Sequence, residues 1–391
     1  MTDQPKPERI RLGMVGGGRD AFIGAVHRIA SRIDDHYELV AGAFSSTPDK
    51  STASAADIGV AADRAYSDYK TMASAEAQRE DGIEAVSIVT PNHLHCPVAT
   101  EFLKRGIHVI CDKPLTSTLD DAKALVAEAE KSGALFVLTH NYTGYPMIRQ
   151  ARAMVADGQL GDIRLVQAEY PQDWLSTKLE DTGQKQAGWR TDPARSGLGG
   201  CIGDIGTHAF NLAGFVSNLK LHSLCADLDT FVEGRQLDDN AHIMLRFEGG
   251  AKGMIWSSQV APGNENGLRV RIYGSKGGLE WSQEDPNYLW FTPLGEPKRL
   301  LTRSGSGATD PANDVSRIPP GHPEGYLEGF ANLYTGAAEA IVKRRTGSEA
   351  DVSLLPSVHD GLVGVAFVTA AVQSSNNGGT WETLDLSLIH I

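Results

Sequence analysis

Three polar residues in two short motifs have the side chains needed to oxidise an alcohol. Lys113 stands in Asp112-Lys113-Pro114, directly after an apolar run, while Asp204 and His208 are four positions apart later in the chain. Alcohol oxidation needs a base that removes the hydroxyl proton as the hydride leaves, and histidine titrates near neutral pH. A lysine can hydrogen-bond the hydroxyl and shift the pKa of a neighbouring base.

Each motif also has a purely structural interpretation. If a helix begins near Asp204, the side chains of Asp204 and His208 lie one turn apart on the same helix face. Asp204 would then orient His208 or hold a second hydroxyl; alternatively, Asp204 caps the helix and His208 is a satisfied core histidine. Pro114 favours an extended Lys113 that points towards a cofactor crevice, but a solvated loop lysine fits the pattern equally.

A glycine-rich turn near the start of the chain predicts a dinucleotide site. Residues 10–15 are an apolar run that leads into Gly16, Gly17 and Gly18, and residues 21–33 have helical periodicity. The spacing Gly16-x-Gly18-x-x-Ala21 fits the dinucleotide fingerprint with alanine at its last position. Glycines let backbone N–H groups and the positive end of the helix face a pyrophosphate, although they also make ordinary turns.

The end of the second strand leaves the choice of cofactor open. NAD sites usually place an acidic residue there for the ribose hydroxyls, whereas this strand runs into Ser45-Ser46-Thr47-Pro48-Asp49-Lys50. The side chains that suit a 2′-phosphate here are Ser45, Ser46 and Lys50. Asp49 is an acidic residue that is compatible with NAD, so NAD or NADP is expected. In the alternative interpretation, Ser46 or Thr47 simply caps a helix.

The remaining candidates lie mainly at the ends of predicted strands, where ligands bind in parallel sheets. Cofactor contacts are expected from Gly16, Gly18, Ala21, Phe22, Ser45, Ser46, Lys50, Thr90, Pro91, Asn92, His95, Asp112, Lys113 and Asn141. Substrate contacts are expected from Tyr142, Trp174, Arg190 and His322. Aromatic faces with polar neighbours suit sugar rings, and they suit subunit interfaces equally. No metal site is expected, because His93 and His95 lie in a proline-containing loop with no carboxylate nearby.

The order of strand and helix signals predicts two α/β domains. Strands alternate with helices over residues 1–140, which is typical of a doubly wound parallel sheet. Over residues 141–391, consecutive strands with short turns predict a mainly antiparallel sheet, followed by two helices. The expected strands are 10–15, 37–44, 85–88, 108–111 and 135–139, and then 163–170, 222–231, 241–247, 253–258, 268–273 and 278–281.

Composition limits the classes of partner. The 391 residues suffice for two domains, and the net charge of −13 argues against nucleic acid or an anionic membrane. The N-terminus is polar and no apolar run is long enough to span a bilayer, so a soluble cytoplasmic protein is expected. The four cysteines, Cys96, Cys111, Cys201 and Cys225, have no metal spacing and are expected to be reduced.

On these motifs the chain resembles the glucose-fructose oxidoreductase and inositol dehydrogenase family, Gfo/Idh/MocA. The resemblance covers the glycine-rich start, Thr90-Pro91-Asn92, Asp112-Lys113-Pro114 in place of the usual Glu-Lys-Pro, and Asp204-Ile205-Gly206-Thr207-His208. It implies a Rossmann domain followed by an α/β domain with a large open sheet, whose exposed face commonly mediates dimers or tetramers. It also implies that His208 accepts the proton while Lys113 and Asp204 place the substrate hydroxyl.

The resemblance implies an NAD(P)-dependent sugar or inositol dehydrogenase that moves a hydride between a secondary alcohol carbon and nicotinamide C4. One alternative is an NAD-dependent glycosidase that uses transient oxidation of a sugar hydroxyl to cleave a glycosidic bond. Another is a protein that keeps the fold but senses or scaffolds, and the intact Lys113, Asp204 and His208 speak against it. The expected partners are a small sugar or polyol and further copies of the chain, as a homodimer or homotetramer.

Overall fold

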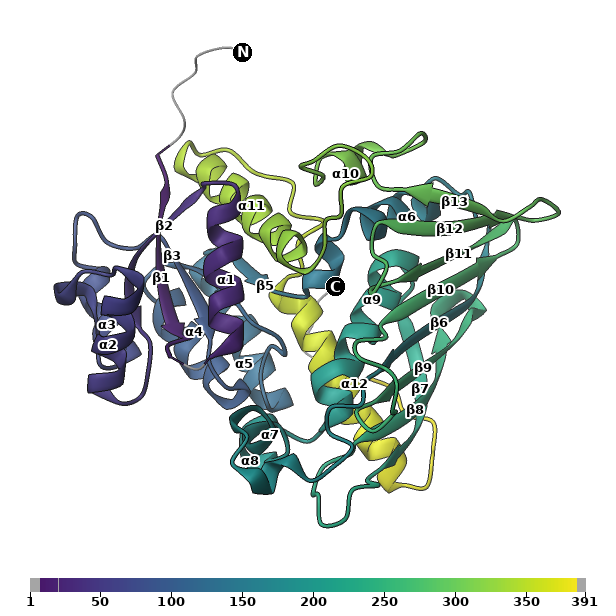
Figure 1. Ribbon diagram of the computed structural model, residues 1–391, viewed down its shortest axis with the longest axis horizontal. Helices are drawn as coiled ribbons and strands as arrows, with labels where there is room; N and C mark the ends of the chain where they lie inside the picture. The colour runs from purple at the N-terminus through teal and green to yellow at the C-terminus, as the bar shows by residue number, and fades with distance from the viewer. Residues whose placement is uncertain (1–7, 20, 385–391) are drawn as a thin grey trace. The chain divides into compact units, whose positions relative to one another are not determined.

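The computed structural model describes residues 8–19 and 21–384, which divide into two compact units (Figure 1). The first unit comprises residues 8–115, 120–141 and 327–359. The second unit comprises residues 116–119, 142–326 and 360–384. A late segment of the chain therefore belongs to the first unit.

The first unit is built on a five-stranded parallel sheet with the strand order β2-β1-β3-β4-β5. Its strands are β1 (Ile10–Gly16), β2 (Tyr37–Ala43), β3 (Ala85–Val89), β4 (His108–Cys111) and β5 (Phe136–Leu138). Its helices are α1 (Phe22–Ile33), α2 (Pro48–Ile58), α3 (Tyr69–Glu76), α4 (His95–Leu103), α5 (Leu119–Ser132) and α11 (Tyr326–Arg345). Parallel strands need crossover helices and become covered on both faces, which is why these strands are nearly continuous apolar runs. The predicted doubly wound sheet is confirmed.

Helix α11 is attached to the first unit by hydrogen bonds as well as by packing. The Tyr37 hydroxyl donates to the carbonyl of Tyr334 at 2.8 Å, and the Arg344 guanidinium donates to the carbonyl of Gly133 at 2.6 Å. The Tyr37 and Tyr334 rings meet edge to face, with their centroids 5.4 Å apart. The Tyr37 hydroxyl of β2 and the Gly133 carbonyl, directly after α5, thus hold α11 against the sheet.

The second unit carries an eight-stranded sheet with the order β13-β12-β11-β10-β6-β9-β8-β7. Neighbouring strands are antiparallel except for the parallel pair β6 and β9. The strands are β6 (Ile163–Pro171), β7 (Leu221–Asp229), β8 (Asn240–Phe247), β9 (Lys252–Ser258), β10 (Arg269–Gly274), β11 (Gly277–Ser282), β12 (Tyr288–Pro293) and β13 (Arg299–Thr302). The last two strands extend the predicted sheet by residues for which no strand was expected.

One face of this sheet is covered by helices, and the other is open. The helices of the unit are α6 (Pro146–Ala156), α7 (Lys185–Arg190), α8 (Pro193–Ser196), α9 (Thr207–Ser217), α10 (Asp310–Asn313) and α12 (Val358–Asn376). Helices α6 and α9 lie against the sheet, and Phe210 of α9 stacks on Phe367 of α12 with ring centroids 4.0 Å apart (Figure 1). The uncovered side, called the open face below, presents side chains that are each 38% to 53% exposed: Leu165, Met244, Met254, Tyr273 and Trp290.

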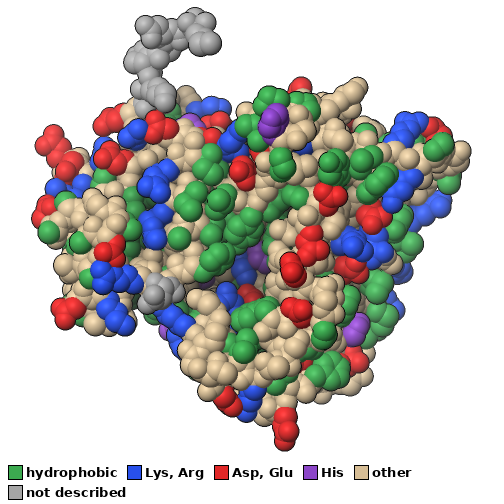
Figure 2. Space-filling model, in the orientation of Figure 1, with side chains coloured by type: hydrophobic (Ala, Val, Ile, Leu, Met, Phe, Trp, Pro, Cys, Tyr) green, Lys and Arg blue, Asp and Glu red, His purple; other side chains and the backbone are tan. Residues whose placement is uncertain are grey.

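The surface charges are mixed in sign. On the side seen in Figure 2, acidic and basic side chains are intermingled over both units. No helix in the described part of the chain is long and apolar enough to cross a membrane. Within residues 8–19 and 21–384, no group of three or more His, Cys, Asp or Glu side chains has an arrangement suited to a metal ion.

Candidate functional site

The glycine-rich turn lies at the carboxyl end of β1 and leads into α1. Gly16 and Gly17 have φ angles of 84° and 71°, in the left-handed region that favours glycine. The Gly18 amide donates to the carbonyl of Phe44 at 3.2 Å, and a Cβ on Gly18 would lie 2.6 Å from that oxygen. The turn is therefore packed against the end of β2 and could not accept side chains.

The start of α1 has the features of an anion site. Ala21 is the N-cap residue and supplies no side-chain hydrogen bond to the helix. Helix N–H groups that lack a capping side chain suit a phosphate group. The close approach between turn and helix is made by Gly24, where a Cβ would lie 2.3 Å from the Cα of Gly17, rather than at Ala21. Phe22 follows as an exposed side chain.

The loop after β2 holds a serine turn, and no side chain caps the helix that follows. Ser45 Oγ accepts a hydrogen bond from the amide of Thr47 at 3.2 Å. Thr47 is the N-cap of α2 but makes no side-chain cap bond, so capping by Ser46 or Thr47 was the wrong alternative. Ser46 and Lys50 are exposed and reach solvent at this edge of the sheet.

Asp112, directly after β4, is a mostly buried carboxylate with several partners. Its Oδ1 atom accepts the Lys113 amide at 3.0 Å and the Thr139 hydroxyl at 3.0 Å. His27 Nε2 lies 3.9 Å from the same oxygen. Burial raises the pKa of Asp112, while His27 and Lys113 lower it, and the balance leaves it below the ordinary value of a carboxyl group. The side chain is thus ionised and its Oδ1 is fixed beside Lys113.

His95 shapes the loops at this edge of the sheet. The buried ring places Nδ1 2.7 Å from the carbonyl of Pro114 and Nε2 2.9 Å from the carbonyl of Thr90. Burial lowers the pKa of His95, against the opposing effects of Asp112 and the two carbonyls. Because both ring nitrogens face backbone oxygens, His95 connects the segment after β3 with the segment that carries Lys113.

Thr90 Oγ1 and Asn141 Nδ2, at the same edge, are among the buried polar atoms that have no hydrogen-bond partner within the described part of the chain. They follow β3 and β5 and so come from the carboxyl edge that also carries Gly16 and Asp112. Buried polar groups are normally satisfied, so such atoms point to a bound molecule. Together with the glycine turn they fit a dinucleotide. Pro91 and the buried Asn92 lie in the loop after Thr90.

In the second unit, Asp204 and His208 lie in a continuous helical segment. A π-helix over Ile202–Gly206 runs directly into α9, so Asp204 lies inside the helix and does not cap it. Its Oδ2 atom accepts the Arg190 Nε at 3.2 Å and the Gln259 amide at 2.9 Å. Isolated π turns often occur at functional sites because they displace side chains from regular helical positions.

The cap of this helix is supplied by Asp238. Its two carboxylate oxygens accept the amides of Gly200 at 2.6 Å and Ile202 at 2.8 Å. Burial raises the pKa of Asp238 to about 6, although both amide bonds lower it. Asp238 was missed, because no local pattern connects it with the Asp204 motif, which lies more than thirty residues earlier in the chain.

His208 is buried beside aromatic rings. The Tyr142 ring meets it edge to face at a centroid distance of 4.9 Å, and Tyr170 lies 6.1 Å away. The Tyr142 and Tyr170 hydroxyls are 2.6 Å apart, and Tyr170 donates to Asn266 Oδ1 at 2.7 Å, so Tyr142 donates to Tyr170. Burial raises the pKa of both phenols, which keeps them protonated as donors.

The same chain of hydrogen bonds continues to a predicted substrate residue. Gln172 donates to Asn266 Oδ1 at 2.8 Å and accepts from the indole of Trp174 at 3.1 Å. The Arg190 guanidinium lies over the Trp189 ring at 4.3 Å and over Trp174 at 6.0 Å. Tyr142, Trp174 and Arg190 are therefore joined in one cluster with Asp204 and His208.

His322 is not a member of that cluster. Its side chain is exposed, and its carbonyl accepts the buried Arg303 guanidinium at 2.6 Å. Among the missed residues, Tyr170 and Gln259 end or follow strands β6 and β9, and the strand-end rule used for the first unit would have found them. Asn266 lies in a loop with no such signal.

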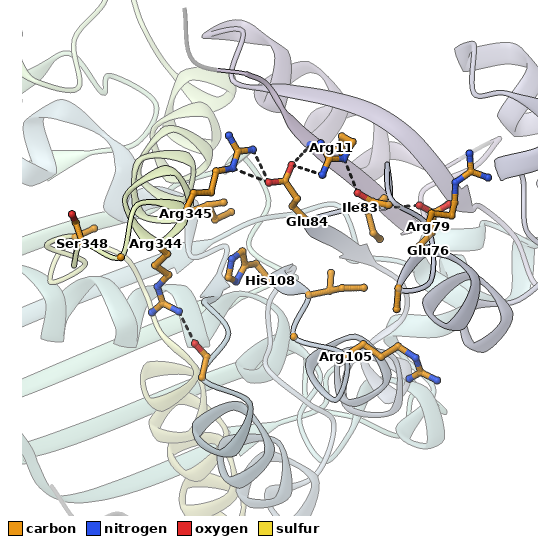
Figure 3. Close-up of a pocket in the computed structure, with 18 of the residues that line it drawn as sticks. Arg11, Glu76, Arg79, Ile83, Glu84, Arg105, His108, Arg344, Arg345 and Ser348 are labelled. Carbon is orange, nitrogen blue, oxygen red and sulfur yellow. Dashed lines mark hydrogen bonds and ion pairs between the residues drawn. The ribbon is translucent and has the colours of Figure 1, made fainter.

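A hollow of the first unit lies at the opposite, amino-terminal edge of its sheet. This cavity of about 1010 Å³ is lined by side chains at the starts of β1, β3 and β4 and the end of α11 (Figure 3). Glu84 pairs with Arg345 at 2.7 Å and with Arg11 at 3.5 Å, and Arg105 pairs with Glu101 at 2.8 Å. Burial lowers the pKa of His108 to about 4, so this histidine is neutral. The two pairs made by Glu84 connect this edge of the sheet to the end of α11.

Comparison with known proteins gives two family matches that cover most of the chain. The family described as "Oxidoreductase family, NAD-binding Rossmann fold" matches residues 10–141, and the "GFO/IDH/MocA C-terminal domain" matches residues 148–280. An uncharacterized oxidoreductase of Bacillus subtilis, YfiI, is 38% identical over 95% of this chain and 96% of its own length.

Solved structures agree with these matches. The crystal structure of an oxidoreductase from Sinorhizobium meliloti is 62% identical, with a TM-score of 0.88, over 96% of this chain and 100% of that one. An inositol dehydrogenase homolog from Azotobacter vinelandii, crystallised with NAD⁺, is 38% identical with a TM-score of 0.92, over 96% of this chain and 98% of that one. It has also been crystallised with NADH and myo-inositol. None of these relatives is described as a glycosidase, so that alternative gains no support.

We predict that Asp238→Asn changes the pH dependence of stability. The folded-state pKa of about 6 lies above the ordinary 3.8, so the unfolded chain loses this proton first as the pH rises. Wild-type stability therefore falls between pH 4 and 6, by about 3 kcal/mol for a shift of about two units. The always-neutral Asn has no such loss, so its stability relative to wild type should rise from pH 4.5 to pH 7.5.

Urea-unfolding midpoints at both pH values test this prediction. Asp227→Asn, at an exposed position on β7, is the matched control and should show no such change. A stability difference between wild type and Asp238→Asn that is constant with pH would contradict the assigned role.

Proposed function

The chain belongs to the Gfo/Idh/MocA family of NAD-binding oxidoreductases, and we propose that it transfers a hydride between a secondary alcohol of a cyclic polyol or sugar and nicotinamide. The observation that carries this proposal is the cluster around His208. In it, a buried imidazole lies among aromatic rings, and Asp204 in the same helical segment is held by Arg190 and Gln259. Such a site combines a base with a fixed acceptor for hydroxyl groups.

His208 is proposed as the general base that takes the hydroxyl proton. Asp204 is proposed to accept a hydrogen bond from a substrate hydroxyl, because Arg190 and Gln259 hold its carboxyl group in place. Lys113, beside the Asp112 carboxylate, is proposed to donate to the oxygen that becomes the carbonyl. NAD, when bound, supplies the carbon that accepts the hydride. Lys113 belongs to the first unit, and Asp204 and His208 belong to the second. Their joint action on one substrate is proposed from the chemistry of the three side chains, and turnover measurements test it.

The cofactor is proposed to bind along the carboxyl edge of the first unit's sheet. Helix α1 and the glycine turn would take the pyrophosphate, and the buried Thr90 hydroxyl and Asn141 amide would satisfy polar atoms of the nicotinamide half. Ser45, Ser46 and Lys50 are proposed for the adenosine ribose. Phe22, Pro91 and Asn92 remain proposed neighbours, while His95 is proposed to position the loops.

The substrate is proposed to be a cyclic polyol or a sugar related to inositol. The Azotobacter vinelandii homolog, which binds myo-inositol in its crystal structure, is 38% identical over nearly the whole chain. Tyr142, Trp174 and Arg190 offer an aromatic and polar lining of the type that suits a ring with several hydroxyls. His322 remains a proposed substrate residue without a contact to that cluster.

We propose a homodimer or homotetramer that forms through the open face, with a second copy of the chain as its partner. Met254→Lys should weaken assembly, because a charge would be buried among Leu165, Met244 and Tyr273 of the open face. Sedimentation equilibrium is expected to show a shift to smaller species. Leu294→Lys, at a 77% exposed apolar position in the turn after β12, is the control and should leave the mass unchanged. A monomeric wild type would contradict the proposal.

We predict that His208→Ala lowers turnover by about 10²-fold to 10⁴-fold, the usual contribution of general base catalysis. The assay measures formation of NADH or NADPH absorbance with a panel of inositols and aldoses, first for wild type and then for the variant. His222→Ala, at an exposed position on β7, is the matched control. Near-normal turnover of His208→Ala would remove this residue from the mechanism, and no net reduction with any polyol would contradict the proposed reaction.

We also predict that Ser45→Asp weakens binding of NADP more than binding of NAD. A carboxylate at this position repels a 2′-phosphate but can accept the ribose hydroxyls of NAD. Calorimetric titration of wild type and variant with both cofactors gives the two ratios of dissociation constants. If the variant changes the dissociation constants of NADP and NAD by the same factor, the adenosine ribose does not bind at Ser45.

A further inference from the structure

A buried polar network lies behind Asp112 in the first unit. His27 of α1, Ser87 of β3 and Tyr334 of α11 are all at most 1% exposed. The Tyr334 hydroxyl is 2.9 Å from His27 Nδ1 and 2.9 Å from Ser87 Oγ, and Ser87 Oγ is 3.3 Å from His27 Nδ1. Side chains from two elements, β3 and α11, thus contact one nitrogen of the imidazole that α1 carries.

These contacts favour one tautomer of His27. Burial and the neighbouring Asp112 raise the pKa of Tyr334, so its hydroxyl is protonated and can donate to Nδ1. In a neutral imidazole whose Nδ1 accepts a hydrogen bond, the proton resides on Nε2. That N–H group faces Asp112, with Nε2 3.9 Å from Oδ1. With the proton on Nε2, Nδ1 accepts from a neighbouring hydroxyl and the Nε2–H group is directed towards the carboxylate.

The Nε2 atom is buried and has no hydrogen-bond partner within the described residues. A buried donor without an acceptor is costly, and the facing atom is a carboxylate oxygen. Closing the gap to hydrogen-bond length needs a movement of about 1 Å. Contacts in active sites often tighten in this way only when substrate and cofactor are bound.

The Oδ1 atom that faces His27 also accepts the Lys113 amide and the Thr139 hydroxyl. Its position therefore fixes the backbone at Lys113, and its charge acts on the Lys113 ammonium group. We propose that His27 is a positioning residue for Lys113 and acts by donating its Nε2–H to the carboxylate of Asp112. This inference rests on the proposed role of Lys113 in the reaction.

Two amide substitutions separate this role from a merely structural one. His27→Asn places an amide oxygen near the Nδ1 position and keeps an acceptor for Tyr334, but the side chain cannot reach Asp112. His27→Gln places an amide N–H near the Nε2 position and keeps the donor for Asp112, but it loses the contact with Tyr334. The two variants thus each retain one half of the interactions of His27.

We predict opposite orders of activity and stability for these variants. His27→Asn should lower kcat for polyol oxidation by about tenfold to a hundredfold, because a misplacement of about 1 Å in a reacting group can cost about a hundredfold in rate. His27→Gln should recover most of that loss, although its thermal midpoint should lie below that of His27→Asn. The KM values for NAD and for the polyol should change little in both. Equal kcat values, or a kcat that follows the thermal midpoint, would overturn the inference.

A measurement on the wild type avoids dependence on folded variants. With ¹⁵N-labelled histidine, NMR of the protein without cofactor should show His27 as the Nε2–H tautomer, and the Nδ1–H tautomer would overturn the inference. His27→Asn in a Lys113→Met background tests the path. In that background His27→Asn should not lower kcat further. If it lowers kcat by the same factor as in the wild type, His27 does not act through Lys113. Normal turnover of Lys113→Met alone would instead reject the proposed role of Lys113, while the tautomer would still report the His27–Asp112 geometry.

Discussion

The ionised, mostly buried carboxylate of Asp112 is the constraint on which the first unit depends. A charge removed from water needs donors around it, and here they come from Lys113, Thr139 and, at a longer distance, His27. Hydrogen bonds to charged groups contribute about 1.5–3 kcal/mol each, so the segments after β4 and β5 are held together at the edge where the sheet's strands end. Tyr334 then fixes His27, which makes α11 part of the same arrangement.

The second unit holds its charged group in a different way. Asp204 is paired with Arg190, whose guanidinium lies over the Trp189 and Trp174 rings, so aromatic faces shield this ion pair. The π-helix over Ile202–Gly206 and its cap, Asp238, set the position of Asp204 relative to His208. Each unit thus positions its own carboxylate, Asp112 or Asp204, through contacts within that unit.

Patterns that are local in the sequence were predictable. The glycine turn, the alternation of apolar strands and helices, and the two motifs with Lys113, Asp204 and His208 depend on neighbouring residues or fixed spacing. The rest depends on contacts between distant positions. The Gly200–Asp238 bond joins residues 38 positions apart, Tyr170 and Asn266 are 96 apart, and His27 and Tyr334 are 307 apart. No single stretch of sequence contains both members of such a pair, so the π-helix cap and the buried tyrosine network could not be anticipated.

The return of α11 to the first unit has a consequence for biosynthesis. Nearly all of the second unit lies between β5 and α11 in the chain, so the ribosome makes the parallel sheet long before the helix that completes it. At about 5–20 residues per second, that delay is roughly 10 to 40 seconds. Throughout it, the pocket for Tyr334 beside Tyr37, Ser87 and His27 has no occupant, so the apolar surface that α11 covers in the folded unit stays exposed until the helix is made.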